Sequence, residues 1–162
     1  GAIGALTFGK LADKQSSKRA IIISLLILIV SLACLYFIDG LIGFFIIGAF
    51  AGFSLSGAQA TSRTMVSQLA PEHKTTEFYG FLSVAGRTST FIGPFVFGAI
   101  SYNMHNYYVE RGLPELLAEQ NGQLWGIGSI LLFLIVGMLI LFSVREVTAS
   151  NPMQYNQKKS EE

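Results

Sequence analysis

Four long apolar stretches dominate the pattern of the chain, and together they contain a single charged residue. They cover residues 20–38, 41–60, 78–102 and 124–144. At about 1.5 Å per residue, helices of this length cross the roughly 30 Å hydrocarbon core of a bilayer. The stretches are continuous, whereas the strands of a membrane barrel alternate apolar and polar residues. The pattern therefore predicts an all-α membrane protein with four transmembrane helices.

Composition supports this class. Of the 162 residues, 51% are hydrophobic and 13% are charged, and soluble domains carry about a quarter charged residues. The only cysteine, Cys34, lies inside an apolar stretch and permits no internal disulfide. The chain starts at Gly1 without a methionine, and residues 1–8 read as the tail of an apolar helix. We expect a fragment of a longer protein with the end of a fifth helix at its start.

The distribution of basic residues predicts the orientation. If the segments 9–19, 61–77 and 145–162 are cytoplasmic, nine basic residues lie inside and only Arg111 lies outside. This asymmetry follows the tendency of cytoplasmic loops to carry lysine and arginine. The nine are Lys10, Lys14, Lys18, Arg19, Arg63, Lys74, Arg145, Lys158 and Lys159.

The outer segment and the C-terminal tail differ in character. Residues 103–125 combine tyrosines, a tryptophan and glutamates, which is typical of an interfacial segment, and Pro114 predicts the start of a short helix. Residues 148–162 are polar, and we expect a disordered cytoplasmic tail. The predicted domains are therefore 1–147, the transmembrane part, and 148–162, the tail.

The stretch GKLADKQSSKR, residues 9–19, joins two apolar segments. Topology alone explains its basic residues. It does not explain the order of Gly9, Leu11 and Asp13 before them. A carboxylate at this place can accept hydrogen bonds from the N-terminus of a neighbouring helix, while Lys14, Lys18 or Arg19 pairs with it or with another acid. Such a contact can hold two helices in one conformation and release them in another.

This stretch resembles the loop motif of the major facilitator superfamily, G-x-L-a-D-[RK]-x-G-[RK]-[RK], found between the second and third helices and, in weaker form, between the eighth and ninth. Two positions depart from it, since Ser16 replaces a glycine and Ser17 replaces a basic residue. The departures resemble the weaker copy. The matching residues are Gly9, Leu11, Ala12, Asp13, Lys14 and Lys18.

Residues 57–98 are similar to the tenth-to-eleventh helix region of the branch that includes the autophagy-related vacuolar effluxers and their bacterial relatives. The resemblance implies that the four stretches are helices nine to twelve, and that the chain is part of a C-terminal half-domain. The residues that carry it are Gly57, Gln59, Ala60, Ser62, Arg63, Pro71, Glu77, Phe78, Tyr79, Gly80, Gly86, Arg87, Gly93 and Pro94.

The resemblance also implies a function. We expect secondary active transport of a small solute by alternating access, with amino-acid efflux as the class that the effluxers suggest. The expected partners are the lipid bilayer, the solute and the N-terminal half of the same chain, with no nucleic acid. No cofactor is expected, and protons are the candidate coupling ion. The expected location is the bacterial inner membrane.

Arg87 is the most informative single residue. It lies about 15 Å beyond Glu77 along the third stretch, hence near the middle of the membrane. A charge there costs at least about 2.5 to 3.5 kcal/mol unless it faces water or a partner. Arg87 either binds an anionic group of the substrate beside Ser83 and Thr90, or forms a structural ion pair with an acid elsewhere, or reaches back to the interface.

Three further features are candidates for moving parts. Gly93 and Pro94 predict a bend in the third stretch, either mobile or static, that borders a cavity. Gly48 and Gly52 form a G-x-x-x-G face that close helix packing would explain. Four polar residues near the inner surface are candidates for an inner gate, although Arg63 could equally anchor its helix at lipid headgroups. They are Gln59, Ser62, Arg63 and Glu77.

Other classes of function fit less well. A membrane-embedded enzyme would need paired acids or a histidine cluster, and Glu72 and Glu77 fit a solvated loop or a helix N-terminus instead. His73 and His105 are lone histidines on predicted opposite sides, so no metal site is expected. A structural or regulatory membrane subunit without transport activity remains an alternative.

Overall fold

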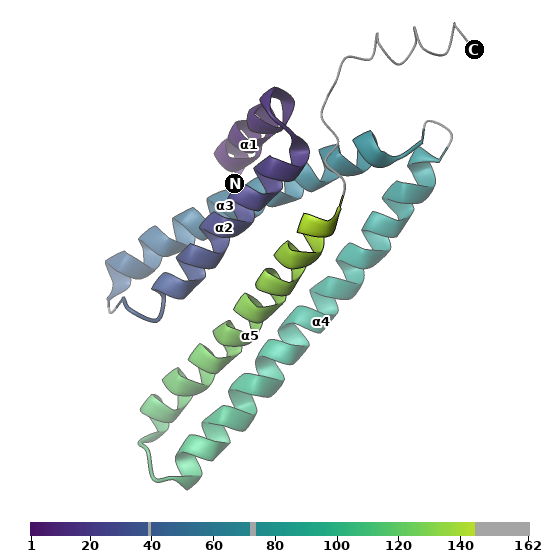
Figure 1. Ribbon diagram of the computed structural model, residues 1–162. Coiled ribbons are helices and arrows are strands. Elements are labelled where there is room, and N and C mark those ends of the chain that lie inside the picture. Colours follow the sequence, from purple (N-terminus) through teal and green to yellow (C-terminus); the bar gives the residue numbers. More distant parts are fainter. Residues whose placement is uncertain (39, 72–73, 145–162) are drawn as a thin grey trace, which may run out of the picture.

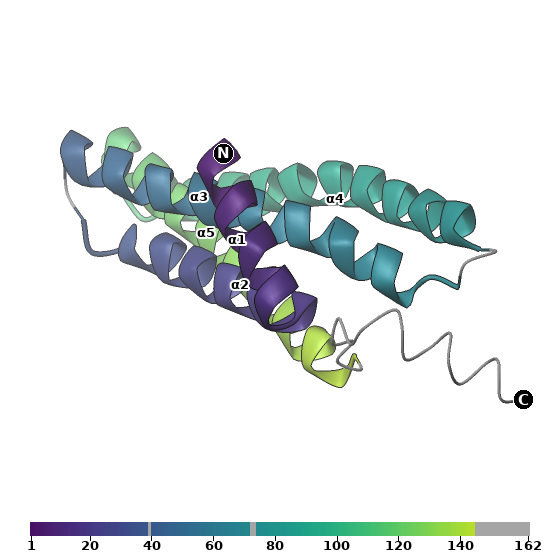
Figure 2. The same ribbon diagram turned by 90° about the horizontal axis from the view of Figure 1, so that it is seen from above.

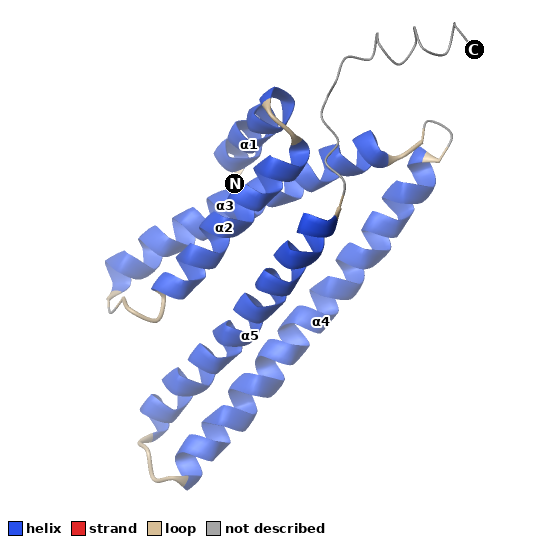
Figure 3. Ribbon diagram, viewed as in Figure 1, coloured by secondary structure: helices blue, strands red, loops and turns tan. Residues whose placement is uncertain are grey.

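The computed structural model describes residues 1–38, 40–71 and 74–144, and all of the regular structure in these ranges is helical (Figures 1 and 3). This confirms the predicted all-α class. Predictions for Glu72, His73, Arg145, Lys158, Lys159 and the tail 148–162 lie outside the described residues. The helices are α1 (Ala2–Lys14), α2 (Ser17–Cys34), α3 (Leu41–Leu69), α4 (Thr75–Glu110) and α5 (Glu115–Ser143).

Helix boundaries differ from the predicted apolar stretches mainly by extension into polar sequence. Helix α1 continues through Lys14, so most of the motif stretch is helical and only Gln15 and Ser16 connect α1 to α2. Helix α3 runs two turns beyond Arg63, to Leu69. The predicted short helix after Pro114 is the beginning of the long helix α5. Gly9 and Gly122 lie inside α1 and α5, and residues 64–69 of α3 contain no glycine or proline, so the helical backbone hydrogen bonds continue through all three segments.

Three of the described helices, α2, α3 and α5, are long and apolar enough to cross a membrane. Helix α4, which contains the predicted span 78–102, is not among them. With 36 residues it is long enough, at roughly 54 Å. Its mean hydropathy is lowered by Arg87 and by the adjacent run Thr88, Ser89 and Thr90. A crossing at α4 therefore stays a prediction from the apolar stretch 78–102.

The first three helices pack into one group. Helix α1 lies across α3 and α2 (Figure 2). The core of this group contains Phe8, Ala12 and Ala20, which are at most 4% exposed. The rings of Phe8 and Phe53 lie 5.4 Å apart, and Gly57 leaves the space that the Phe8 ring fills. Two residues of the motif stretch, Leu11 and Ala12, are therefore packing residues.

Helices α4 and α5 form a second group, a long antiparallel hairpin (Figure 1). Its closest approach is at Gly122 and Gly126, where α5 meets Phe97, Ser101 and His105 of α4. A β-carbon added at Gly122 would lie 2.6 Å from the Ser101 carbonyl oxygen. This glycine pair with G-x-x-x-G spacing allows the two backbones to approach closely.

The predicted glycine face at Gly48 and Gly52 behaves differently. A β-carbon at either position would meet no described atom within 4 Å. The packing that this G-x-x-x-G pattern predicts is therefore not formed among the described residues. Of the packed pair, Gly122 lies in the segment 103–125 that was expected to be interfacial, and Gly126 lies in the predicted fourth span.

The aromatic side chains at the far end of the hairpin contact one another as an interfacial segment would. The indole nitrogen of Trp125 donates to the Tyr108 hydroxyl at 3.2 Å. The Arg111 guanidinium lies 4.3 Å from the centre of the Tyr107 ring. Gly112 supplies the positive φ of 82° that the turn between α4 and α5 requires.

Replacing Gly122 by alanine should separate α4 from α5. We expect Gly122→Ala to destabilise the folded chain in detergent by about 1 to 3 kcal/mol, because the new methyl group overlaps the Ser101 carbonyl. Thermal unfolding measures the effect. Gly137→Ala in the same helix is the matched control, since its β-carbon meets nothing within 4 Å. Equal unfolding temperatures for the two variants would contradict this packing.

Candidate functional site

The motif stretch is built around the N-terminus of α2. Ser16 is the N-cap, and its hydroxyl oxygen accepts a hydrogen bond from the Arg19 backbone amide at 3.2 Å. Ser17 donates to the side-chain oxygen of Gln68 at 2.7 Å. Both serines are 1% exposed. The two departures from the superfamily motif therefore have structural roles: one starts α2 and the other ties α2 to the end of α3.

Sequence reasoning missed Gln68 entirely and treated Ser16 only as a departure. A serine directly before a long charge-free run is a recognisable helix-start signal, and this could have identified the cap. No local signal could have identified Gln68. It lies in a segment that was predicted to be a loop, and its partner is 51 residues away.

The charged residues of the motif separate into two kinds. The Lys18 ammonium donates to the backbone carbonyl oxygens of Phe142 at 2.9 Å and Val144 at 2.6 Å, at the C-terminal end of α5. Asp13 and Lys14 end α1 and are exposed. The Asp13 carboxylate has no hydrogen bond or ion pair with any described residue. In this conformation, Lys18 is therefore bonded to the end of α5 and not to Asp13.

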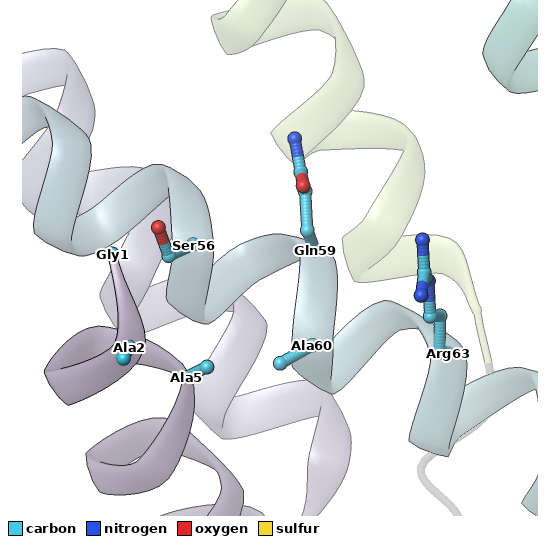
Figure 4. Close-up of a pocket in the computed structure, with 7 residues that line it drawn as sticks. All are labelled: Gly1, Ala2, Ala5, Ser56, Gln59, Ala60 and Arg63. Atoms are coloured by element: carbon cyan, nitrogen blue, oxygen red, sulfur yellow. The ribbon is translucent and has the colours of Figure 1, made fainter.

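Two of the predicted inner-gate residues line a cavity of about 270 Å³ between α1 and α3. Gln59 and Arg63 lie one turn apart on α3, and their side chains project from the same side of that helix (Figure 4). Both are exposed. The remaining lining residues are small and contain no acid: Gly1, Ala2, Ala5, Ser56 and Ala60.

The structure does not bring the other two gate candidates to this cavity. Ser62 is not among the lining residues. Glu77 lies exposed in the first turn of α4, where a carboxylate interacts favourably with the helix dipole. No ion pair joins Glu77 to Arg63. The link between these helix ends is a 3.3 Å hydrogen bond from the Tyr79 hydroxyl to the Arg63 carbonyl oxygen.

The predicted substrate-path residues lie on α4, and none of its described side chains is buried. Arg87 and Ser83 are exposed, and Arg87 has no hydrogen bond or ion pair with any described residue. The hydroxyl of Thr90 donates to the Gly86 carbonyl oxygen at 2.8 Å, and those of Thr88 and Ser89 bond to their own helix in the same way. These three donors are satisfied, while their oxygens can still accept.

The predicted bend lies beside an apolar cavity. Helix α4 continues through Pro94. Because proline has no backbone amide hydrogen, the Thr90 carbonyl loses its usual helical donor. Gly93 and Ser89 line a cavity of about 420 Å³ against α5, with Ile92, Ile130, Phe133 and Leu134. Arg87 does not line this cavity.

Metal chemistry finds no support in the described ranges. No group of three or more histidine, cysteine, aspartate or glutamate residues within residues 1–38, 40–71 and 74–144 is placed to hold a metal ion. His105 lies beside Glu115 and Glu119 along a shallow cavity at the far end of the hairpin.

Comparison with known proteins gives a consistent family assignment. The model of the family described as "Vacuole effluxer Atg22 like" matches residues 1–110. The MFS-type transporter YxiO of Bacillus subtilis is 23% identical over 150 residues, which are 93% of this chain and 31% of that protein. No solved structure matches the chain.

Fungal relatives match shorter parts of the chain. Autophagy-related protein 22 of Kluyveromyces lactis is 37% identical over 62 residues, 38% of this chain and 13% of that protein. The Yarrowia lipolytica protein of the same name is 28% identical over 117 residues, 64% of this chain and 20% of that protein. The chain thus spans about a third or less of the length of these relatives.

The family model covers more than half of the chain and includes helices α1 to α4, with the motif stretch and Arg87. The family is described as one of effluxers, and the Bacillus subtilis relative is named a transporter, so these names indicate a transporter and not an enzyme. The chain is an integral, multi-pass membrane protein, and it belongs to the vacuole effluxer Atg22-like family within the major facilitator superfamily.

Proposed function

We propose that the full-length protein is a secondary active transporter of a small solute that works by alternating access between two half-domains. In this proposal residues 1–147 belong to the C-terminal half, and residues 148–162 form a cytoplasmic tail. Membership of a family of effluxers supports transport in the outward sense. The opposite half of the transport path would come from the N-terminal half of the same chain.

The proposal rests on the exposure of Arg87 and on the absence of a partner for it among the described residues. Arg87 lies exposed on a helix that flanks the strongly apolar α5, and no described residue neutralises it. A guanidinium in hydrocarbon is too costly to remain without a partner or water. Its partner must therefore be solvent, substrate or an acid beyond the described residues. We infer that it binds an anionic group of the substrate, beside the hydroxyls of Ser83 and Thr90.

A solute with a carboxylate fits a site of this kind. Arginine binds carboxylates bidentately, and the Thr90 carbonyl, which Pro94 deprives of its usual donor, can accept a hydrogen bond from an ammonium group. Amino acids carry both groups, and they are the substrate class that we propose. We further propose coupling to protons and a location in the bacterial cell membrane, the latter supported by the Bacillus subtilis relative.

The inner ends of the helices would then change partners during the cycle. Asp13 is exposed and has no partner among the described residues in this conformation, and we propose that it accepts hydrogen bonds from another helix end in the alternative conformation. Gln59 and Arg63, with Ser62 and Glu77 nearby in sequence, are the proposed inner gate. The absence of an acid from the cavity at Arg63 leaves this guanidinium available for a group outside the described residues.

Neutralising Arg87 tests this proposal. In the full-length protein in proteoliposomes, Arg87→Gln should lower the flux of radiolabelled amino acids by at least about tenfold while membrane insertion stays intact. Arg87→Lys should retain part of the flux because the charge remains. Arg111→Gln, which removes an arginine at the far end of the hairpin, is the control. Unchanged flux in Arg87→Gln would exclude a role in substrate binding.

A further inference from the structure

Helix α5 is attached to α2 by side-chain hydrogen bonds at both ends of their contact. We propose that Lys18 and Tyr36 act as positioning residues that fasten α5 to α2. The line of contact between two packed helices is called a seam below. The seam between α2 and α5 stays closed, while the seam between α3 and α4 opens and closes. The fastening itself is independent of the proposed function. Its role in a conformational cycle rests on that proposed function.

The inner fastener is Lys18. The last carbonyl groups of a helix have no partner within the helix, and at the end of α5 two of them, at Phe142 and Val144, accept from the Lys18 ammonium. The positive charge also interacts favourably with the C-terminal end of the helix dipole. Topology requires only that a lysine be on this side of the membrane, so it does not explain two short bonds to one helix end.

The outer fastener is Tyr36, which follows the last turn of α2. Its hydroxyl donates to the Leu124 carbonyl oxygen at 2.6 Å. Gly128 makes room for this contact, since a β-carbon there would lie 3.1 Å from the Tyr36 oxygen. The two fasteners are separated by most of the length of α2, so together they fix both the position and the direction of α5.

Between the described residues of α3 and α4 there is no such pair of hydrogen bonds at the two ends of the seam. The residues of α3 that are buried include Ser54, Gly57 and Thr61, and α3 packs mainly on α1 and α2. Helix α4 packs mainly on α5. Among the described residues, the side-chain link between α3 and α4 is the hydrogen bond from the Tyr79 hydroxyl to the Arg63 carbonyl oxygen, at 3.3 Å and near their connection. Of the two seams, this one is the less restrained.

Spin labels test the fastening without any transport assay. In the full-length protein in proteoliposomes, with native cysteines replaced, a label at Ser143→Cys reports on the end of α5. Lys18→Met should sharpen its spectrum, because the end of α5 becomes mobile. Lys18→Arg should keep the spectrum broad, since arginine also donates to carbonyls. Lys10→Met, an exposed lysine of α1, is the matched control. An unchanged spectrum in Lys18→Met would overturn the proposal.

The outer fastener is tested in the same way, which also keeps the proposal falsifiable if Lys18→Met does not insert. Tyr36→Phe removes a single oxygen, so it should not disturb folding. A label at Gln123→Cys, an exposed residue of α5, should become more mobile in Tyr36→Phe. A spectrum identical to that of the protein with Tyr36 would count against the fastening.

Cross-linking distinguishes this proposal from the proposed function. A reducible bifunctional methanethiosulfonate across Tyr36→Cys and Leu124→Cys should leave the flux within about twofold of the uncross-linked variant. The matched pair, Ser67→Cys and Tyr79→Cys, joins α3 to α4, and linking it should lower the flux roughly tenfold until the link is reduced. A reversible loss of flux on linking α2 to α5 would overturn the closed seam. If the uncross-linked protein transports no tested solute, the proposed function fails, and the label spectra decide the fastening alone.

Discussion

Polar groups that cannot reach water must find partners inside the protein, and this constraint decides how the helices of this chain begin, end and meet. Within the helices the backbone amides and carbonyls form hydrogen bonds with one another. Hydroxyls such as those of Ser24, Thr61 and Thr90 donate to carbonyl oxygens of their own helix. At the helix ends, side chains supply the missing partners. Ser16 starts α2 and Lys18 ends α5. The N-terminus of α2 is thus where three helix ends are joined.

This arrangement changes the meaning of the superfamily motif in this chain. Its first part is the last turn and a half of α1, where Leu11 and Ala12 pack in the core. Its last part is the hydrogen-bonded start of α2. Between them Asp13 is exposed and has no partner among the described residues. The motif in this chain therefore retains its packing and its helix caps, and the proposed change of partners during transport would involve Asp13.

A feature of the fold can be predicted from the sequence when neighbouring residues determine it, and not when it depends on a residue far away in the chain. Apolar stretches predict the helices well, because a bilayer requires long continuous runs. The helix ends are less predictable, because polar residues after Arg63 or before Trp125 neither stop nor start a helix. The two G-x-x-x-G pairs show the limit. Gly48 and Gly52 have the same spacing as Gly122 and Gly126, yet only the latter pair meets a described helix. Which of the two glycine faces is packed depends on which helix lies opposite it.

Arg87 has no partner among the described residues. A solute bound there would favour a transporter, whereas an ion pair with an acid elsewhere in the protein would favour a structural membrane subunit. The most direct measurement is the flux of radiolabelled amino acids by the full-length protein in proteoliposomes, with and without an imposed proton gradient. The account predicts saturable flux that depends on the protein and is driven by the gradient. Flux that is indifferent to the gradient, or no flux of any small solute, would contradict it.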